Sequence, residues 1–255
     1  MMKSKQVYYY KDELNDEFSK AQIKPRKIDY TYKYVRNPIW DFSSLIIQNI
    51  LSMPIKIGYA KGKFKIKYIG KEKLKECKKQ GYFLYGNHTQ AFADTFIPSI
   101  AVYPKRNFLI VNPANVSVKP FGGIVEMLGA MPIPCDKNGM INMLHAIQQR
   151  VEKGNSITIY PEAHIWPYYT KIRPFKDVSF KYPVKFDKPA YCFTNTYQKR
   201  KNKVQIVTYI DGPFFANKRL NFKEQQRDLR DRIYNTMVER SKNNNIEVIR
   251  YEKQS

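Results

Sequence analysis

His88 and Asp94 stand close together in the segment 85–94, YGNHTQAFAD. The residues Tyr82–Tyr85 predict a strand, which puts His88 in a polar turn at a strand end. An imidazole titrates near neutral pH and therefore suits a general base. A carboxylate within reach accepts the other ring N–H, fixes the tautomer and stabilises the imidazolium. Because no serine or cysteine stands at a nucleophile-elbow motif, the pair predicts a base that activates a substrate hydroxyl directly.

A second polar group follows another predicted strand, Ser156–Tyr160. Glu162 comes just after this strand and can hold the hydroxyls of a substrate or the N–H groups of its own loop, or simply cap the turn. Lys171 and Arg173 farther along the loop offer positive charge to a phosphate. No aspartate follows His164 at a spacing similar to that between His88 and Asp94, so we expect His164 to bind substrate at most.

The remaining histidine and the cysteines indicate no metal site. His145 falls in a predicted helix, and the scattered histidines and cysteines lack the spacing of zinc ligands. We therefore expect no metal and no cofactor. Cys77, Cys135 and Cys192 lie far apart, which favours reduced thiols and a cytoplasmic setting.

These segments together resemble the glycerolipid acyltransferase family, whose best-known member is 1-acylglycerol-3-phosphate acyltransferase. The family has an Asn-His motif with a downstream Asp, a Gly-x-x-x-Ile-x-Arg-like strand, Pro-Glu-Gly and a late apolar segment with proline. The counterparts here are residues 87–94, 129–137, 161–163 with 174–176, and 188–190, in the same order.

The resemblance implies an α/β acyltransferase fold, an acyl-thioester donor (acyl-CoA or acyl carrier protein) and a lysophospholipid acceptor. His88 is then the general base and Asp94 its partner. Residues expected to bind the substrate are Asn87, Asp136, Lys137, Glu162, His164, Lys171 and Arg173.

The sequence departs from the family pattern in two places. Five residues rather than four separate His88 from Asp94, and one extra residue on a continuous helix turns a side chain by about 100°. We therefore expect His88 to lie in the turn before the helix. Ala163 replaces the family's glycine and the arginine that usually follows is absent, so Lys171 or Arg173 would supply the missing charge.

Strand-like and helix-like segments alternate from about residue 63 onward. This alternation predicts an α/β fold, a mixed and mostly parallel seven-stranded sheet flanked by helices, with its site where strands end. The expected strands are Phe64–Ile69, Tyr82–Tyr85, Asn107–Val111, Ala130–Ile133, Ser156–Tyr160, Ala190–Thr194 and Val204–Ile210. The expected helices are Lys71–Gln80, Phe92–Val102, Val116–Leu128, Met140–Lys153 and Phe222–Ser241.

The N-terminal part differs from the rest. Residues 1–37 are polar, basic and tyrosine-rich, and we expect an irregular arm. Ile39–Met53 has helical spacing and should end at Pro54. It is too short and too polar to span a bilayer, and suits either a membrane-interface helix or a helix packed on its own domain. We therefore divide the chain into residues 1–58 and an acyltransferase domain, residues 59–255.

Basic residues dominate the composition, with 45 Lys and Arg against 22 Asp and Glu, a net charge of +23. Such a charge attracts an anionic membrane leaflet or nucleic acid, although a lysine-rich genome would also produce it. Together with this charge, the tyrosines at residues 8–10 and 30–34 support a nucleic-acid-binding protein as the alternative function. No recognised nucleic-acid motif is present, so we expect a peripheral enzyme at the cytoplasmic face of the membrane. An acyltransferase-like protein with another lipid acceptor is a further alternative.

Overall fold

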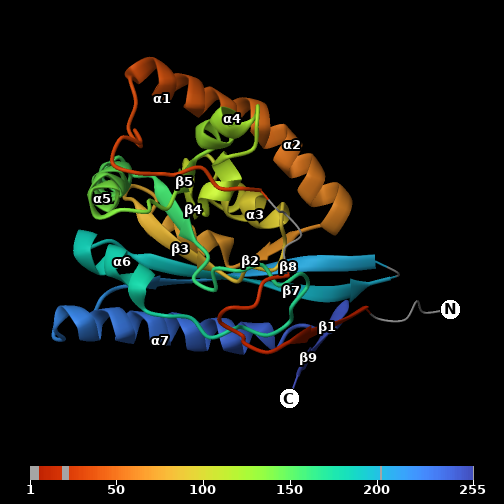
Figure 1. The fold of residues 1–255 in the computed structure, drawn as a ribbon. Coiled ribbons are helices and arrows are strands. Elements are labelled where there is room, and N and C mark those ends of the chain that lie inside the picture. The colour runs from red at the N-terminus through yellow and green to blue at the C-terminus, as the bar shows by residue number, and fades with distance from the viewer. Residues whose placement is uncertain (1–5, 19–22, 202, 255) are drawn as a thin grey trace.

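The computed structural model describes residues 6–18, 23–201 and 203–254, so residues 1–5 and 19–22 of the expected arm lie outside it. A seven-stranded sheet forms the centre, in the order β2-β8-β7-β3-β6-β4-β5 (Figure 1). Only the β7–β8 pairing is antiparallel, which confirms the predicted mostly parallel sheet. The strands are β2 (Lys67–Ile69), β3 (Tyr82–Gly86), β4 (Asn107–Val111), β5 (Ala130–Pro132), β6 (Ser156–Ile159), β7 (Ala190–Arg200) and β8 (Lys203–Phe214).

Helices cover both faces of this sheet. They are α1 (Pro38–Leu45), α2 (Ser52–Tyr59), α3 (Ala93–Val102), α4 (Gly122–Met127), α5 (Lys137–Glu152), α6 (Lys181–Phe186) and α7 (Phe222–Ser241). Successive side chains of a strand point to opposite faces. Phe83 and Tyr85 of β3 therefore join a core with α5 and α7, while Leu84 packs on the α3 side. β3 is buried along its whole length, as a central strand of an α/β sheet should be.

The first long helix does not end at Pro54, contrary to the prediction. A π-helical turn at Ile46–Leu51 connects α1 to α2, and a second π-helical turn at Ala60–Phe64 follows α2. Together these segments form one continuous helix that ends at Phe64. Pro54 lies inside this continuous helix, three residues after the π-helical turn Ile46–Leu51, where the regular hydrogen-bond pattern is already interrupted. The predicted division between residues 58 and 59 falls inside α2.

The same helix turns apolar side chains outward and polar ones inward. Arg106 at the start of β4 donates to Asp41, Ser44 and Gln48, so polar contacts hold the helix to the domain. Lys56 also faces inward and is only 4% exposed. Figure 1 shows the helix along the upper edge of the molecule. Its exposed apolar residues, here called the apolar ridge, are Ile39, Phe42, Leu45, Ile50, Leu51 and Ile55.

Two other predictions of local structure are wrong. The arm is not wholly irregular, because β1 (Gln6–Tyr10) pairs in parallel with a strand near the other end of the chain, β9 (Ile249–Lys253). The segment Lys71–Gln80 forms only a 3₁₀ turn, Lys71–Lys75, followed by hydrogen-bonded turns. Lysines spaced at helical intervals along it repel one another, which disfavours a continuous α-helix.

Candidate active site

The loop after β3 is fixed by close contacts with β7. A Cβ on Gly86 would lie 2.2 Å from the Phe193 ring, so only glycine fits at this strand end. Asn87 then bridges to the backbone of Asn195, donating to its carbonyl at 3.0 Å and accepting its N–H at 2.8 Å. Asn87 is 1% exposed, and both ends of its amide are used inside the protein. It therefore positions the loop and does not bind substrate, contrary to the prediction.

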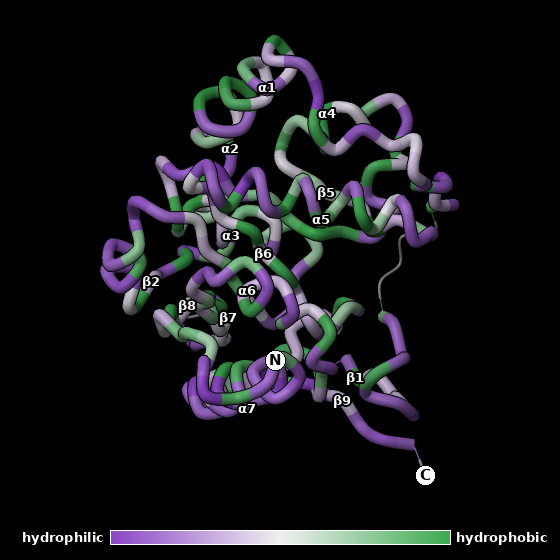
Figure 2. Tube along the Cα trace, turned by 90° about the vertical axis from the view of Figure 1, so that its left-hand side faces the viewer, coloured by the Kyte–Doolittle hydropathy of each residue, from purple (hydrophilic) through white to green (hydrophobic). Residues whose placement is uncertain are grey.

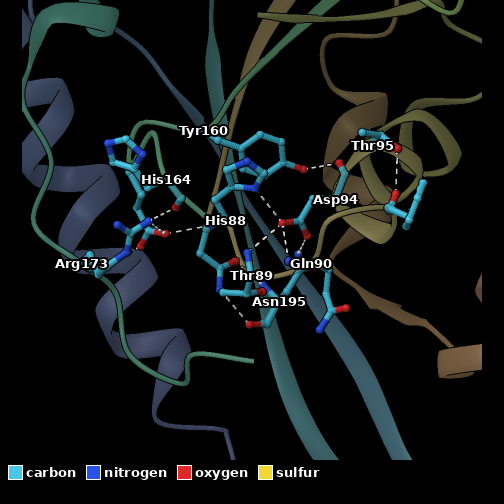
Figure 3. Close-up of polar contacts among 12 residues, drawn as sticks. His88, Thr89, Gln90, Asp94, Thr95, Tyr160, His164, Arg173 and Asn195 are labelled. Carbon is cyan, nitrogen blue, oxygen red and sulfur yellow. Dashed lines mark hydrogen bonds and ion pairs between the residues drawn. The ribbon is translucent and has the colours of Figure 1, made fainter. Parts of the chain in front are cut away.

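His88 and Asp94 meet at the end of β3 (Figure 3). The Nδ1 atom of His88 lies 2.9 Å from Oδ2 of Asp94. The same oxygen accepts the backbone N–H groups of Thr89 and Gln90, at 2.7 and 2.8 Å. Since α3 begins at Ala93, the extra residue between the two side chains is taken up by the loop, as the spacing required.

The Asp94 carboxylate is fully buried, and all its contacts come from donors. Its second oxygen, Oδ1, accepts the side-chain amide of Asn195 at 3.2 Å. Burial raises the pKa of Asp94, while the donors on His88, Gln90 and Thr89 act in the opposite direction. A carboxylate held in this way keeps the proton of the imidazole on Nδ1.

The other ring nitrogen of His88, Nε2, has no hydrogen-bond partner among the residues that the structure describes. The side chain is 18% exposed, so this nitrogen can reach a substrate. Tyr160 at the end of β6 stacks on the imidazole, with ring centroids 4.4 Å apart and planes 18° apart. Its hydroxyl donates to the backbone carbonyl of Asp94. Tyr160 therefore fixes the plane of the imidazole and covers one of its faces.

Glu162 ties the loop after β6 to the histidine. Its carboxylate accepts the backbone N–H of His88 and that of Arg173, each at 2.9 Å. Burial raises the pKa of Glu162, and the Arg173 guanidinium opposes this effect. Glu162 is 4% exposed, so its carboxylate binds N–H groups inside the protein, one of the three roles considered for it, and not a substrate hydroxyl.

Arg173 does not face an acceptor phosphate, contrary to the prediction. Its side chain is completely buried. The guanidinium donates to Glu162 and to the backbone carbonyls of His164 and Glu13. It also lies over the Trp166 ring, 4.9 Å from its centroid. Arg173 is the internal counter-ion of Glu162, because a buried carboxylate needs such a partner.

Both ends of the chain support this loop. Trp166 is fully buried and donates its indole N–H to the carbonyl of Asp16 at 2.8 Å. Tyr251 of β9 stacks on it at 5.1 Å, and Tyr10 of β1 packs against it at 4.8 Å. The backbone N–H of Trp166 donates to the His88 carbonyl at 3.1 Å. The aromatic group is therefore connected to His88 by a single hydrogen bond, from the Trp166 N–H to the His88 carbonyl.

The remaining predicted residues lie around the site or away from it. His164 pairs with Glu17 at 3.4 Å, and Figure 3 shows its ring on the side away from Asp94. Lys171 is exposed on the same loop and stays available to an acceptor. Asp136 caps α5 by accepting the Gly139 N–H, and Lys137 follows it in that helix. Both follow β5, three strands or about 14 Å from β3, so the structure does not bring them to His88.

Sequence reasoning missed three residues that shape the site. Asn195 lies one residue beyond the predicted strand at Ala190–Thr194, and its contact with Asp94 spans about a hundred residues of sequence. Tyr160 and Trp166 look like ordinary core aromatics in the sequence. An asparagine continuing a buried strand was the one available signal, since buried amides need partners.

Comparison with known proteins gives the family. The sequence model described as Acyltransferase matches residues 65–208, more than half of the chain. The chain belongs to the acyltransferase family. The predicted resemblance to glycerolipid acyltransferases is confirmed, and the chain is an acyltransferase enzyme. The matched region contains His88, Asp94, Glu162 and Asn195.

A solved structure has the same fold as this acyltransferase. It is the 1-acyl-sn-glycerophosphate (LPA) acyltransferase PlsC from Thermotoga maritima, with a TM-score of 0.54. The alignment covers 82% of this chain and 84% of that one at 15% sequence identity, so the likeness concerns the fold. No curated protein sequence matches the chain.

Proposed function

We propose that this acyltransferase moves a fatty acyl group from an acyl thioester to the hydroxyl of a lysophospholipid, with 1-acylglycerol-3-phosphate as the expected acceptor. Acyl-CoA or acyl carrier protein is the expected donor, and the product is a diacyl phospholipid precursor. The single observation that supports this most is the buried Asp94 carboxylate 2.9 Å from Nδ1 of a His88 whose Nε2 is free. The acyltransferase activity by which the Thermotoga maritima protein is named is consistent with this proposal.

The chemistry is one acyl transfer. Nε2 of His88 takes the proton of the acceptor hydroxyl as that oxygen attacks the thioester carbonyl carbon. The carbon–sulfur bond breaks, and the thiol leaves with the proton carried by His88. Asp94 balances the imidazolium during the step, and Tyr160 and Glu162 keep the ring and its backbone in position. Lys171 is an exposed cation of the loop and suits an acceptor phosphate.

Peripheral binding to an anionic membrane belongs to the same proposal. The apolar ridge on α1 and α2 suits the acyl–headgroup boundary, and the net charge of +23 suits an anionic leaflet. In Figure 2 hydrophobic segments appear along this helix at the top of the molecule. None of the helices in the described part of the chain has the length and hydropathy needed to cross a bilayer.

The test is acyl transfer by the purified protein with radiolabelled acyl-CoA and acyl carrier protein against a panel of lysolipids. We expect transfer to 1-acylglycerol-3-phosphate and a loss of about 10²–10⁴-fold in turnover for His88→Ala. His145→Ala, on the exposed surface of α5, is the matched control. Near-normal turnover by His88→Ala would refute the mechanism. Transfer to another lysolipid alone would change the acceptor and keep the chemistry.

A further inference from the structure

A large cavity lies outside the site described above. It has a volume of about 730 Å³, and His88 is not among its lining residues. The arm between residues 26 and 37 forms most of it, and Trp40 in the first turn of α1 completes it. The catalytic chemistry does not use this cavity, which we call the arm pocket.

The arm pocket is strongly basic. Its lining has four cations and one carboxylate, that of Asp29. Behind the lining, Glu126 pairs with two of the arginines and is nearly buried. Four cations thus face two carboxylates, and the excess positive charge is held in a hollow. The cations are Arg26, Lys27, Lys33 and Arg36.

A neighbouring hollow extends this charge. It has a volume of about 430 Å³, shares Arg26 with the arm pocket, and adds Lys24 and Lys119. A recess with cations on its walls suits a phosphate group, which accepts several charge-assisted hydrogen bonds at once. Within the part of the chain that the structure describes, Lys27 and Lys33 have no strong partner and can supply these hydrogen bonds. Lys27 lies 3.9 Å from Asp29, and its side chain is 75% exposed.

The arm pocket adjoins the apolar ridge. Trp40 lines the pocket, with the Arg36 guanidinium 4.0 Å above its ring. Two ridge residues, Ile39 and Phe42, lie within two positions of Trp40 in the sequence. Ile39 is 77% exposed and Phe42 65% exposed. An indole beside cations and apolar side chains is typical of a surface at headgroup depth. If the arm pocket bound an acidic protein instead of a lipid headgroup, it would not need these apolar side chains beside it.

We propose that the arm pocket binds the phosphate of an anionic phospholipid headgroup while the apolar ridge enters the acyl region of the same leaflet. This inference rests on the proposed membrane association, and it adds a lipid-binding site separate from the catalytic one. The enzyme then prefers anionic over neutral membranes through a defined pocket and not through its net charge alone.

The test compares two double variants that remove the same charge. Lys27→Gln with Lys33→Gln changes the arm pocket, while Lys185→Gln with Lys242→Gln changes α6 and the end of α7, on the opposite side of the molecule (Figure 1). Sedimentation is measured with phosphatidylcholine vesicles with and without phosphatidylglycerol, at physiological ionic strength. We expect the arm-pocket variant to bind the anionic vesicles about 30-fold more weakly, as two lysines at an anionic leaflet imply, and the control to bind nearly as wild type.

A second readout follows Trp40 emission with short-chain phosphatidylglycerol, short-chain phosphatidylcholine or inorganic phosphate as probes, and Trp40→Phe identifies the source of the signal. We expect a change with the anionic lipid that the arm-pocket variant loses. Equal losses from both double variants, or an equal response to inorganic phosphate, would overturn the headgroup site. So would weaker binding of acidic carrier protein with unchanged vesicle binding. If the wild type binds no vesicles, membrane association itself fails, whereas acyl transfer in detergent tests the catalytic proposal separately.

Discussion

Asp94→Asn separates the charge of the site from its shape. Oδ2 of Asp94 accepts three donors, on His88, Thr89 and Gln90, so the oxygen of the new amide should stay on that side. Its NH₂ group then replaces Oδ1 and faces the amide of Asn195, which was 3.2 Å away. The imidazole keeps its N–H on Nδ1, and what disappears is the charge opposite the imidazolium.

The size of the effect follows from this geometry. A hydrogen bond to a charged group contributes about 1.5–3 kcal/mol, which corresponds to about 10- to 150-fold in rate. We expect kcat to fall by roughly 100-fold and the KM for the acceptor to change little, because Asp94 does not touch the substrate. Burial raises the pKa of Asp94, so the ionised carboxylate costs folding energy near neutral pH. Removing this cost offsets the loss of the hydrogen bond from Asn195, so the Tm of the variant should stay close to that of wild type at pH 7.

The assay is steady-state acyl transfer together with thermal unfolding at the same pH. Asp231→Asn, on the exposed face of α7, is the matched control. Wild-type kcat in Asp94→Asn would show that the charge is not used in the transition state. A large drop in Tm would show that the lost activity reflects unfolding, and would contradict the reasoning about burial.

Three further predictions concern stability and the acceptor. Burial lowers the pKa of Lys56 to about 8, so its charge opposes folding at pH 7, and this penalty fades as pH rises from about 8 toward 10.5. Lys56→Met should therefore raise the free energy of unfolding by about 2–3 kcal/mol at pH 7. Urea titrations should show this difference shrinking by about pH 10. Ala163 has φ 64°, so Ala163→Gly should raise the free energy of unfolding by about 0.5–1 kcal/mol, and a lower value would contradict the strain. Arg173→Ala should lower the free energy of unfolding by about 3–5 kcal/mol because it leaves Glu162 unpaired. Lys171→Ala should keep the wild-type Tm and raise the KM for the acceptor. If melting and kinetic assays show instead that Arg173→Ala keeps Tm and raises this KM, Arg173 binds the phosphate.

Local patterns in the sequence predicted most of the fold. All seven strands of the main sheet were predicted, because apolar runs such as Ser156–Ile159 are bounded by turns. The β1–β9 pair was missed, since the tyrosines of Gln6–Tyr10 lie among charged residues and their partner strand is about 240 positions away. Lysine repulsion along Lys71–Lys75 outweighed helical spacing.

The site was predictable only where its residues are neighbours in sequence. His88 and Asp94 belong to one loop, so their spacing was informative. Asn195 could not be inferred, because its partner lies on another strand. Arg173 was misinterpreted for a related reason: a sequence shows that a side chain is charged, but not that it is buried against Glu162.

The pairing of β1 with β9 sets an order in which the enzyme can mature during synthesis. Trp166 contacts the His88 carbonyl, and its ring is packed between residues from both ends of the chain, Tyr10 and Tyr251. A nascent chain still attached to the ribosome before β9 emerges can form the central sheet but cannot complete this packing. Catalytic competence should therefore arrive only after β9 has left the ribosome, which delays acyl transfer until residues 249–253 can pair with β1.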